Sequence, residues 1–459
     1  MKTWCVSRGV LLAAAAAIAP GLSQAVAQTA PAATTAAPAT APAPTPAADA
    51  PPPGLWIDGI HLSAQLDAGF NINPSNPRDG KNFGQLFTDY ANQATINQLL
   101  LTANKPLDPK DSDFQWGFKL QGMYGSDARY TQYLGIFNNA VPGDRYQFDI
   151  VEANALFHLP VVTSGGLDLK VGLYPTPLGY ETIDPSTNPF YTHSYIFQFG
   201  LPFKHTGGLA VLHVNDMLDV YGGVDTGTNT TFGVLGENNS AIGGITGVNL
   251  TLMGGNLTVL ALTHFGPEQA SRFLGNPSVT GLPTGYNADG YWRYYNDIVI
   301  TYKATDALTL VTELNLVRDD FGKTTNPGKP VNAFGIAQYA SYALSDTLTL
   351  NGRAELFRDD NNFFVASYAN NNDPVKVQQG FVVPFGPYAA AGSNATYTAL
   401  TVGVTWKPNV SAPLSGLLIR PEVRWDHAFA SGRTYNVNSG TGKGTLDNVT
   451  FAADAVITF

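Results

Sequence analysis

The feature that most constrains the fold of this chain is a strict alternation of apolar and polar residues along short segments. In residues 448–459, one face carries Val449, Phe451, Ala453, Ala455, Ile457 and Phe459. The other face carries Asn448, Thr450, Asp454 and Thr458. A period of two places these two sets on opposite faces of a β-strand. The last segment is therefore expected to be a strand that separates two different environments.

The same alternation recurs along the chain and predicts sixteen strands. They are 60–71, 95–103, 113–124, 149–159, 167–174, 206–215, 217–226, 241–252, 257–265, 291–303, 307–318, 332–344, 348–357, 396–406, 417–427 and 448–459. Short turns between them alternate with long polar loops at 72–94, 125–148, 175–205, 266–290, 358–395 and 428–447. An even strand number, with short turns on one rim and long loops on the other, is typical of a transmembrane antiparallel β-barrel. The predicted fold class is all-β, with the short turns on the periplasmic side.

The placement of charges favours a membrane barrel over a soluble one. Seventeen strand charges share the register opposite the bulky apolar face: Asp67, Lys119, Glu152, Asp168, Lys170, Asp219, Asp225, Arg293, Asp297, Glu313, Arg353, Glu355, Arg420, Glu422, Arg424, Asp426 and Asp454. A charge that faces lipid at mid-bilayer costs about 2–4 kcal/mol, whereas a charge that faces a wet lumen costs little. A small soluble barrel has the reverse arrangement, with its apolar residues inside. The sequence therefore predicts a polar, water-filled interior.

An internal repeat supports a barrel that is built from hairpins. The residues of 302–320 that recur forty positions later are Tyr302, Asp306, Leu308, Thr309, Leu310, Leu316, Arg318, Asp319 and Asp320. Their counterparts are Tyr342, Asp346, Leu348, Thr349, Leu350, Leu356, Arg358, Asp359 and Asp360. We expect these two strand–turn–strand units to share one design.

The N-terminal region predicts export. Lys2 and Arg8 flank a short basic stretch, an apolar run follows, and Ala25-Val26-Ala27 offers a small-residue cleavage site. This pattern is typical of a secretory signal peptide, assigned to residues 1–27. Residues 28–53 consist of eleven Ala, eight Pro, five Thr, one Gln and one Asp, a composition that predicts a disordered linker. The barrel is assigned to residues 54–459.

Composition and motifs argue against nucleic-acid binding, cofactors and most enzyme classes. The formal net charge is −10 and basic clusters are lacking, so we expect no nucleic-acid partner. The only cysteine is Cys5, inside the predicted signal peptide, and the seven histidines show no metal-ligand spacing. We therefore expect no catalytic residues, no cofactor and no metal. Outer-membrane phospholipase chemistry needs only Ser, His and Asn, so the pair His193-Ser194 leaves an enzyme as a minor alternative.

Several short motifs identify a family resemblance. They are Trp56-Ile57-Asp58-Gly59, the Gly-rich segment from Lys170 to Glu181, Asn188, and His205-Thr206-Gly207. In these motifs the chain resembles the beta-barrel porin-2 (OmpL-like) family over essentially residues 55–459. The resemblance implies a barrel pore without a defined solute. The alternating last strand that ends in Phe459 also resembles the terminal strand of outer-membrane barrels, which the barrel-assembly machinery reads.

The loop at 175–205 is the expected functional centre. A sixteen-stranded barrel leaves an aqueous channel too wide for much size selection, so a further element should narrow it. Folded inward, this loop would bring Glu181, Asp184 and Tyr191 opposite the wall residues Arg353, Arg420 and Arg424. Opposed acids and guanidinium groups would then create a transverse field across a pore constriction. In the alternative, the acids are solvated and the arginines pair with Glu355 and Glu422 along the wall.

The expected function is passive diffusion of small hydrophilic solutes through an outer-membrane porin of a Gram-negative bacterium. A substrate-selective porin for sugars or small organic acids is the first alternative, and an outer-membrane enzyme or adhesin is the second. The expected partners are outer-membrane lipid, lipopolysaccharide and the assembly machinery, and a homotrimer is left open. The seventeen inward charges comprise eleven acids and six bases, so a preference for cations is expected.

Overall fold

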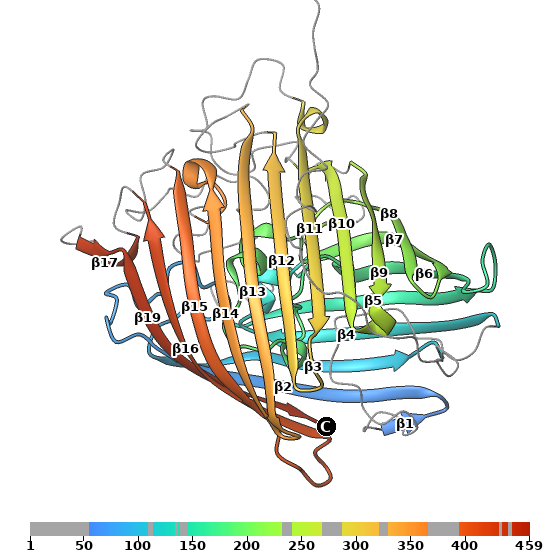
Figure 1. The fold of residues 1–459 in the computed structure, drawn as a ribbon, viewed down its shortest axis with the longest axis horizontal. Helices are drawn as coiled ribbons and strands as arrows, with labels where there is room; N and C mark the ends of the chain where they lie inside the picture. The colour runs from blue at the N-terminus through green and yellow to red at the C-terminus, as the bar shows by residue number, and fades with distance from the viewer. Residues whose placement is uncertain are drawn as a thin grey trace, which may run out of the picture. The chain divides into compact units, whose positions relative to one another are not determined.

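Sixteen strands pair edge to edge in a closed antiparallel barrel (Figure 1). The computed structural model describes residues 55–108, 113–133, 136–137, 145–231, 241–268, 287–320, 329–365, 394–430, 434–438 and 443–459. The expected signal peptide (1–27) and linker (28–53) lie outside these described residues. Within the described ranges, no helix is long and apolar enough to cross a membrane.

The barrel wall runs in sequence order. Its strands are β2 (Ile60–Ile72), β3 (Gln93–Lys105), β4 (Gln115–Gly125), β5 (Gln147–Leu159), β6 (Leu167–Pro175), β7 (Lys204–Asn215), β8 (Leu218–Asp225), β9 (Gly243–Leu252), β10 (Leu257–Pro267), β11 (Trp292–Lys303), β12 (Leu308–Asp319), β13 (Val331–Ser345), β14 (Leu348–Asp359), β15 (Ala395–Trp406), β16 (Gly416–Phe429) and β19 (Asp447–Thr458). Each strand pairs with its neighbour along the chain, and β19 closes the barrel by pairing with β2 from Phe451↔Ile72 to Thr458↔Gln65. All sixteen predicted strands are confirmed, with ends that differ by a few residues.

Minor elements complete the described structure. The short strand β1 (Leu55–Ile57) forms a hairpin with β2, and β17 (Tyr435–Asn438) pairs with β18 (Lys443–Thr445) in the last long loop. The helical pieces are α1 (Ala128–Thr131), the 3-10 turns η1 (Pro185–Thr187), η3 (Met253–Gly255), η4 (Ala288–Gly290) and η5 (Asp360–Asn362), and the π-helix η2 (Ile196–Gly200). The three extra strands were not predicted from the sequence, because segments of three or four residues are too short to show a clear alternation.

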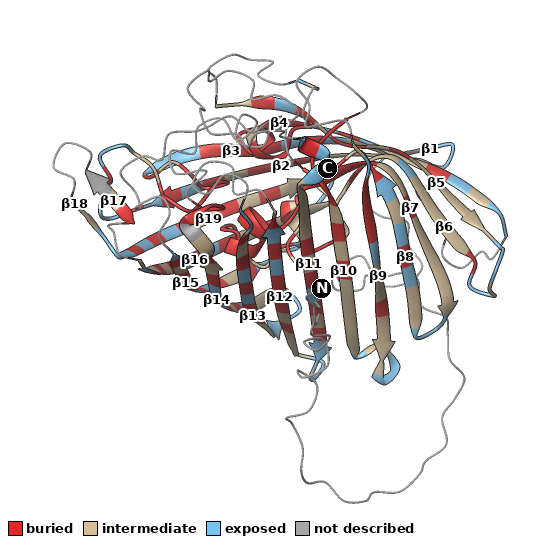
Figure 2. Ribbon diagram, turned by 90° about the horizontal axis from the view of Figure 1, so that it is seen from above, coloured by how far each residue is buried: buried red, intermediate tan, exposed pale blue. Residues whose placement is uncertain are grey.

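Buried and more exposed residues alternate along strands of the wall, as the inward and outward registers predict (Figure 2). Large apolar residues such as Leu101 and Trp116 are 62% and 53% exposed on the outer face. Inward charges such as Arg353, Arg420 and Asp454 are buried within the barrel. This is the reverse of a small soluble barrel, and it matches a wall with lipid outside and polar groups inside.

The repeated hairpins share one register. Tyr302 of β11 pairs with Leu310 of β12, and Tyr342 of β13 pairs with Leu350 of β14. The forty-residue repeat therefore reflects two hairpins of the same design, as the sequence predicted.

An apolar cluster fills part of the barrel interior next to the long loops. It brings together Phe83 and Phe87 from the loop after β2, Tyr130 of α1, and Phe197 and Phe203 from the loop after β6. Phe87 packs against Phe197 and Phe203, with ring centroids 5.4 Å and 5.8 Å apart. The sequence predicts one inward loop, whereas the structure packs several loops together inside the wall.

The strand that closes the barrel generates the first prediction. The amide of Phe459 donates to the Ala64 carbonyl at 2.9 Å, and its side chain is exposed on the outside. We expect deletion of Phe459 to lower the amount of folded protein in the outer membrane, because the closing strand loses its terminal apolar residue. Heat-modifiable gel migration measures the folded fraction, and planar bilayers measure the conductance of each surviving channel, which should not change.

Phe451→Ala is the matched control, since Phe451 is an outward phenylalanine of the same strand, away from the terminus. We expect this variant to assemble better than the truncated chain. Normal assembly of the truncated chain would contradict the proposed role of Phe459.

Candidate functional site

Loop 3, residues 176–203 between β6 and β7, lies inside the barrel and crosses it. Its contacts reach Arg353 on β14, which is eight strands from β6 in a sixteen-stranded circuit. The loop therefore contacts the wall halfway round from its own stem. The turn η1 orders its middle, and the Asp184 side chain caps this turn by accepting from the Ser186 amide at 2.9 Å.

Glu181 is the centre of the bonds that hold loop 3 to the wall. Its carboxylate contacts the Arg353 guanidinium at 2.7 Å and accepts from the Tyr339 hydroxyl at 3.0 Å. Within the loop it contacts His193 Nδ1 at 2.8 Å and accepts from the Ser194 amide at 3.0 Å. The side chains of Glu181 and Arg353 are 1% and 0% exposed, so the pair is shielded from solvent.

The environment of Glu181 favours its charged form. Burial raises the pKa of Glu181, but attraction to the Arg353 guanidinium and the hydrogen bond from His193 outweigh burial and lower the pKa to about 2. The carboxylate is therefore ionised at neutral pH, as a charge-assisted bond to arginine requires.

Acids of the wall accept hydrogen bonds from the backbone of loop 3. Glu422 accepts from the amides of Tyr191 at 2.8 Å and Thr192 at 3.2 Å, and also from the Thr192 hydroxyl. Glu355 accepts from the Tyr195 amide at 2.6 Å. These bonds satisfy buried amides of an irregular segment, which would otherwise carry a desolvation cost.

Arginines of the wall make the complementary bonds to loop carbonyl groups. Arg420 donates to the carbonyls of Pro185 at 2.7 Å and Asn188 at 2.6 Å. Arg424 donates to the His193 carbonyl at 2.8 Å. Loop 3 is thus held through its donors by wall acids and through its acceptors by wall arginines.

The six residues proposed from the sequence all lie at this contact between loop and wall, in different roles. Glu181 and Arg353 form an ion pair, whereas the Asp184 carboxylate accepts from Gln65 at 3.0 Å and from Ser186. The Tyr191 hydroxyl donates to Asn97 at 2.8 Å.

The expected alternative holds only in part: arginines pair with Glu355 along the wall, whereas Glu181 is buried rather than solvated and Glu422 binds the amides of loop 3. Arg420 pairs with Asp454, Arg424 with Asp426 at 2.7 Å, and Arg424 with Glu355 at 3.2 Å. The geometry therefore combines direct pairing between loop and wall with pairing along the wall.

A glycine of the wall makes room for Tyr191. A Cβ atom placed on Gly69 of β2 would lie 2.3 Å from the Tyr191 ring, closer than atoms approach in proteins. The ring therefore lies directly on the strand backbone, which fixes this part of loop 3 against β2.

Sequence reasoning missed the part that Tyr339, His193 and the wall acids Glu355 and Glu422 play in holding loop 3. The inward register already marked the two acids, but their loop partners depend on the path of an irregular segment. The sequence offers His193-Ser194 as a candidate catalytic pair. In the structure His193 and the Ser194 amide bind Glu181, and the Ser194 hydroxyl accepts from the Phe197 amide at 3.0 Å.

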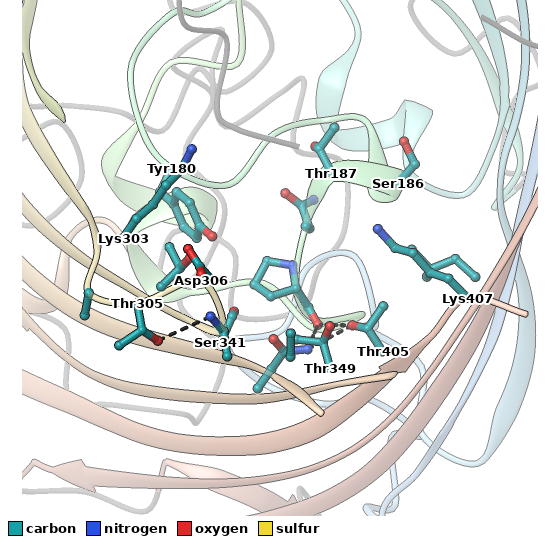
Figure 3. A pocket seen from close by; sticks show the side chains of 18 of the residues that line it. Tyr180, Ser186, Thr187, Lys303, Thr305, Asp306, Ser341, Thr349, Thr405 and Lys407 are labelled. Atoms are coloured by element: carbon teal, nitrogen blue, oxygen red, sulfur yellow. Dashed lines mark hydrogen bonds between the residues drawn. The ribbon is translucent and has the colours of Figure 1, made fainter. Parts of the chain in front are cut away.

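A polar cavity of about 650 Å³ lies between loop 3 and the short-turn rim (Figure 3). Tyr180, Ser186 and Thr187 of loop 3 line one side, and residues of the turns and strand ends line the other. Lys303 and Lys407 lie on opposite sides of the cavity, and Asp306 lies in the turn after β11. The remaining lining is rich in hydroxyl and amide groups: Asn188, Asn256, Thr305, Thr309, Ser341, Thr349, Asn351 and Thr405.

Comparisons with known proteins agree with this architecture. A model of the family described as "Putative beta-barrel porin-2, OmpL-like" matches residues 59–459. No curated protein matches the chain significantly. Among solved structures, an anion-selective porin from Comamonas acidovorans is similar with a TM-score of 0.51 and 10% identity, over 87% of this chain and 99% of that one. OmpF of Salmonella typhi, in complex with daunomycin, gives a TM-score of 0.51 and 10% identity over 88% and 99%.

The ion pair of Glu181 generates the second prediction. Glu181→Gln removes the closer of the two carboxylates that pair with the buried Arg353, at 2.7 Å against 3.3 Å for Glu355, and breaking a buried ion pair costs up to roughly 3–5 kcal/mol. We expect loop 3 to loosen, measured as faster proteolysis within the loop and noisier single-channel currents. Asp184→Asn is the matched control, because Asp184 lies in the same loop and accepts from Gln65 and Ser186. Equal behaviour of the two variants would contradict the central role of Glu181.

The lowered pKa of Glu181 generates the third prediction. Its pKa is about 2 in the folded protein, against an ordinary value of 4.5. The ion pair therefore contributes stability that is present above about pH 4.5 and is lost as the pH falls towards about 2. We expect steady currents from neutral pH down to about pH 4, with loosening of loop 3 only below about pH 3. Loosening centred near pH 4.5 would show that the pKa of Glu181 is not lowered.

Proposed function

This chain belongs to the beta-barrel porin-2, OmpL-like family, and from that premise we propose that loop 3 forms the constriction of its pore. The protein is an outer-membrane porin, a channel for small hydrophilic solutes. The proposal concerns how the passage is narrowed and which ions it prefers. Glu181, Asp184, Tyr191, Arg353, Arg420 and Arg424 are its constriction residues.

The observation that carries this proposal is the contact of loop 3 with the opposite wall. A sixteen-stranded barrel is wide, and a segment held on both sides divides its lumen. The bonds from Arg353, Arg420 and Glu422 fix the loop in one position, so the free space around it keeps a constant shape. A fixed, polar-edged opening admits hydrated solutes and disfavours apolar ones.

Cation preference follows from the charge of the lumen. Eleven inward acids exceed six inward bases, and Glu181 and Asp184 add two acids in loop 3. The wall arginines Arg353, Arg420 and Arg424 pair with Glu181, Asp454 and Asp426, so the two charges of each pair largely cancel and the excess of acids remains. The net field of the lumen is therefore negative.

The cavity between loop 3 and the short-turn rim favours a second candidate function, selective passage of sugars or small organic acids. Its hydroxyl and amide lining suits hydrogen bonds to polar solutes, and Lys303 and Lys407 suit a carboxylate. In this alternative the cavity binds the solute, and conductance falls when that solute is added.

The expected partners outside the pore belong to the same proposal. The outward apolar face suits outer-membrane lipid, and the terminal Phe459 suits recognition by the barrel-assembly machinery. Arg318 and Arg358 suit lipopolysaccharide phosphates, although each also pairs with a nearby acid, Asp320 at 2.8 Å and Asp360 at 3.3 Å. Export by a cleaved signal peptide (1–27), a linker at 28–53 and assembly into a homotrimer complete the proposal.

Ion selectivity supplies the fourth prediction. In planar bilayers under a KCl gradient, we expect stepwise ohmic conductance and a reversal potential of cation-selective sign. The preference should be strongest in dilute salt, because screening acts over about 10 Å at 0.1 M. Neutralising both cavity lysines with Lys303→Gln and Lys407→Gln should increase the preference, whereas Asp306→Asn should decrease it.

The same recordings separate the two candidate functions. A reversal potential of anion-selective sign, together with block by small carboxylates, would overturn the cation proposal in favour of the selective channel. A folded protein that gives no conductance steps would contradict both. Unchanged selectivity and conductance in the double variant Glu181→Gln and Asp184→Asn would remove loop 3 from the pore.

A further inference from the structure

Three potential metal ligands meet inside the barrel, away from the contacts between loop 3 and the opposite wall. His205 lies at the start of β7, Asp225 at the end of β8 and His264 near the end of β10. All three side chains are fully buried, with 0% exposure. The three come from different strands, which explains why their spacing in the sequence gives no sign of a site.

The positions of the ligand atoms suit a small divalent ion. Asp225 Oδ2 lies 3.1 Å from His205 Nδ1, and Asp225 Oδ1 lies 3.1 Å from His264 Nε2. All three ligand atoms lie within 4.8 Å of one another. An ion bound at about 2.0–2.2 Å from nitrogen and carboxylate oxygen separates its ligands by somewhat more than 3 Å. The two Asp–His distances are already close to this separation.

Polar atoms without hydrogen-bond partners point into this cluster. His205 Nδ1 and Asp225 Oδ2 lie 3.1 Å apart as an ion pair, and neither atom has a well-directed hydrogen bond among the described residues. Buried polar atoms are almost always hydrogen-bonded, so two facing atoms without such bonds need an explanation. A metal ion between them satisfies both.

The surroundings orient His205 and Asp225, though not His264, as outer-shell partners do at metal sites. His205 Nε2 lies 3.0 Å from the Thr176 hydroxyl, so Nδ1 is the nitrogen that faces Asp225. Asp225 Oδ1 accepts from the Gly227 amide at 2.8 Å. Metal-binding histidines usually donate through their other nitrogen, and bound carboxylates are themselves hydrogen-bonded.

A glycine on the intervening strand allows the cluster to form. Strand β9 lies between β8 and β10, and Gly243 is its residue opposite Asp225. A Cβ atom at Gly243 would lie 2.8 Å from Asp225 Oδ1 and 3.1 Å from His264 Nε2. Any side chain at this position would crowd the space between these two ligands.

We propose that His205, Asp225 and His264 bind a divalent transition-metal ion of the zinc class. Two imidazoles and one carboxylate form a borderline ligand set, which suits zinc better than the all-oxygen sites of calcium or magnesium. Thr176 begins loop 3 and His205 follows its end, so the ion clips the stem of loop 3 to β8 and β10. This role is structural.

The test uses the full-length folded porin, stripped with a chelator and titrated with Zn²⁺ by calorimetry. We expect one ion per chain, bound at least about tenfold more weakly in His264→Gln and Asp225→Asn. Thr176→Val, which keeps the side-chain shape but removes the outer-shell hydroxyl, should weaken binding by about 10–100-fold. Co²⁺ in place of Zn²⁺ should give visible absorption bands that His264→Gln abolishes.

His213→Gln is the matched control, because His213 lies on the same strand β7 and contacts Asp168 and Asp219 instead. It should bind Zn²⁺ like the unaltered protein. Heat-modifiable migration verifies that each variant is folded before titration. The proposal is overturned if the unaltered folded protein binds no Zn²⁺, if His264→Gln binds it equally well, or if only His213→Gln loses binding. In the first case the three residues form a His–Asp–His cluster held by direct contacts alone.

Discussion

The constraint on which this structure depends is that backbone groups within a lipid bilayer must find their hydrogen bonds inside the protein. A sheet satisfies this requirement only when it closes, because an open edge would leave unpaired amides and carbonyls in lipid. The pairing of β19 with β2 provides the closure. Closure then separates two environments, so residues of alternating polarity are forced onto a lipid face and an inner face. The position of every inward charge follows from this separation.

The inner charges in turn determine how loop 3 is held. A long irregular segment carries many amides and carbonyls that need partners wherever water is excluded. The wall supplies carboxylates for the amides, as Glu422 does for Tyr191 and Thr192, and guanidinium groups for the carbonyls, as Arg420 does for Pro185. Buried charges are tolerated only when they are paired. The same residues that would be costly in lipid therefore become the attachment points of the loop.

The barrel wall and the bonds that hold loop 3 differ in how far the sequence predicts them. The sixteen strands and the inward register were predictable, because alternation repeats locally and a one-residue slip would turn every charge towards lipid. The meeting of Glu181 with Arg353 was predictable only as a general opposition of loop acids and wall bases. The binding of Glu355 to the Tyr195 amide was not predictable, because it depends on the path of a loop without periodicity. The cluster of His205, Asp225 and His264 was missed for a similar reason, since it assembles across four neighbouring strands.

Loop 3 is held both at its stem and at its far side. The Thr176 amide donates to the Phe203 carbonyl at 2.9 Å, so the loop leaves and re-enters the wall at one point. The far side of the loop is fixed by Glu181 and Arg353, and its stem lies beside His205. A segment held at both ends has few alternative positions, whereas a segment held only at its stem could swing through the lumen. The Glu181–Arg353 pair at the far side and the proposed metal ligands at the stem therefore both restrict the conformational freedom of loop 3, the segment that divides the pore.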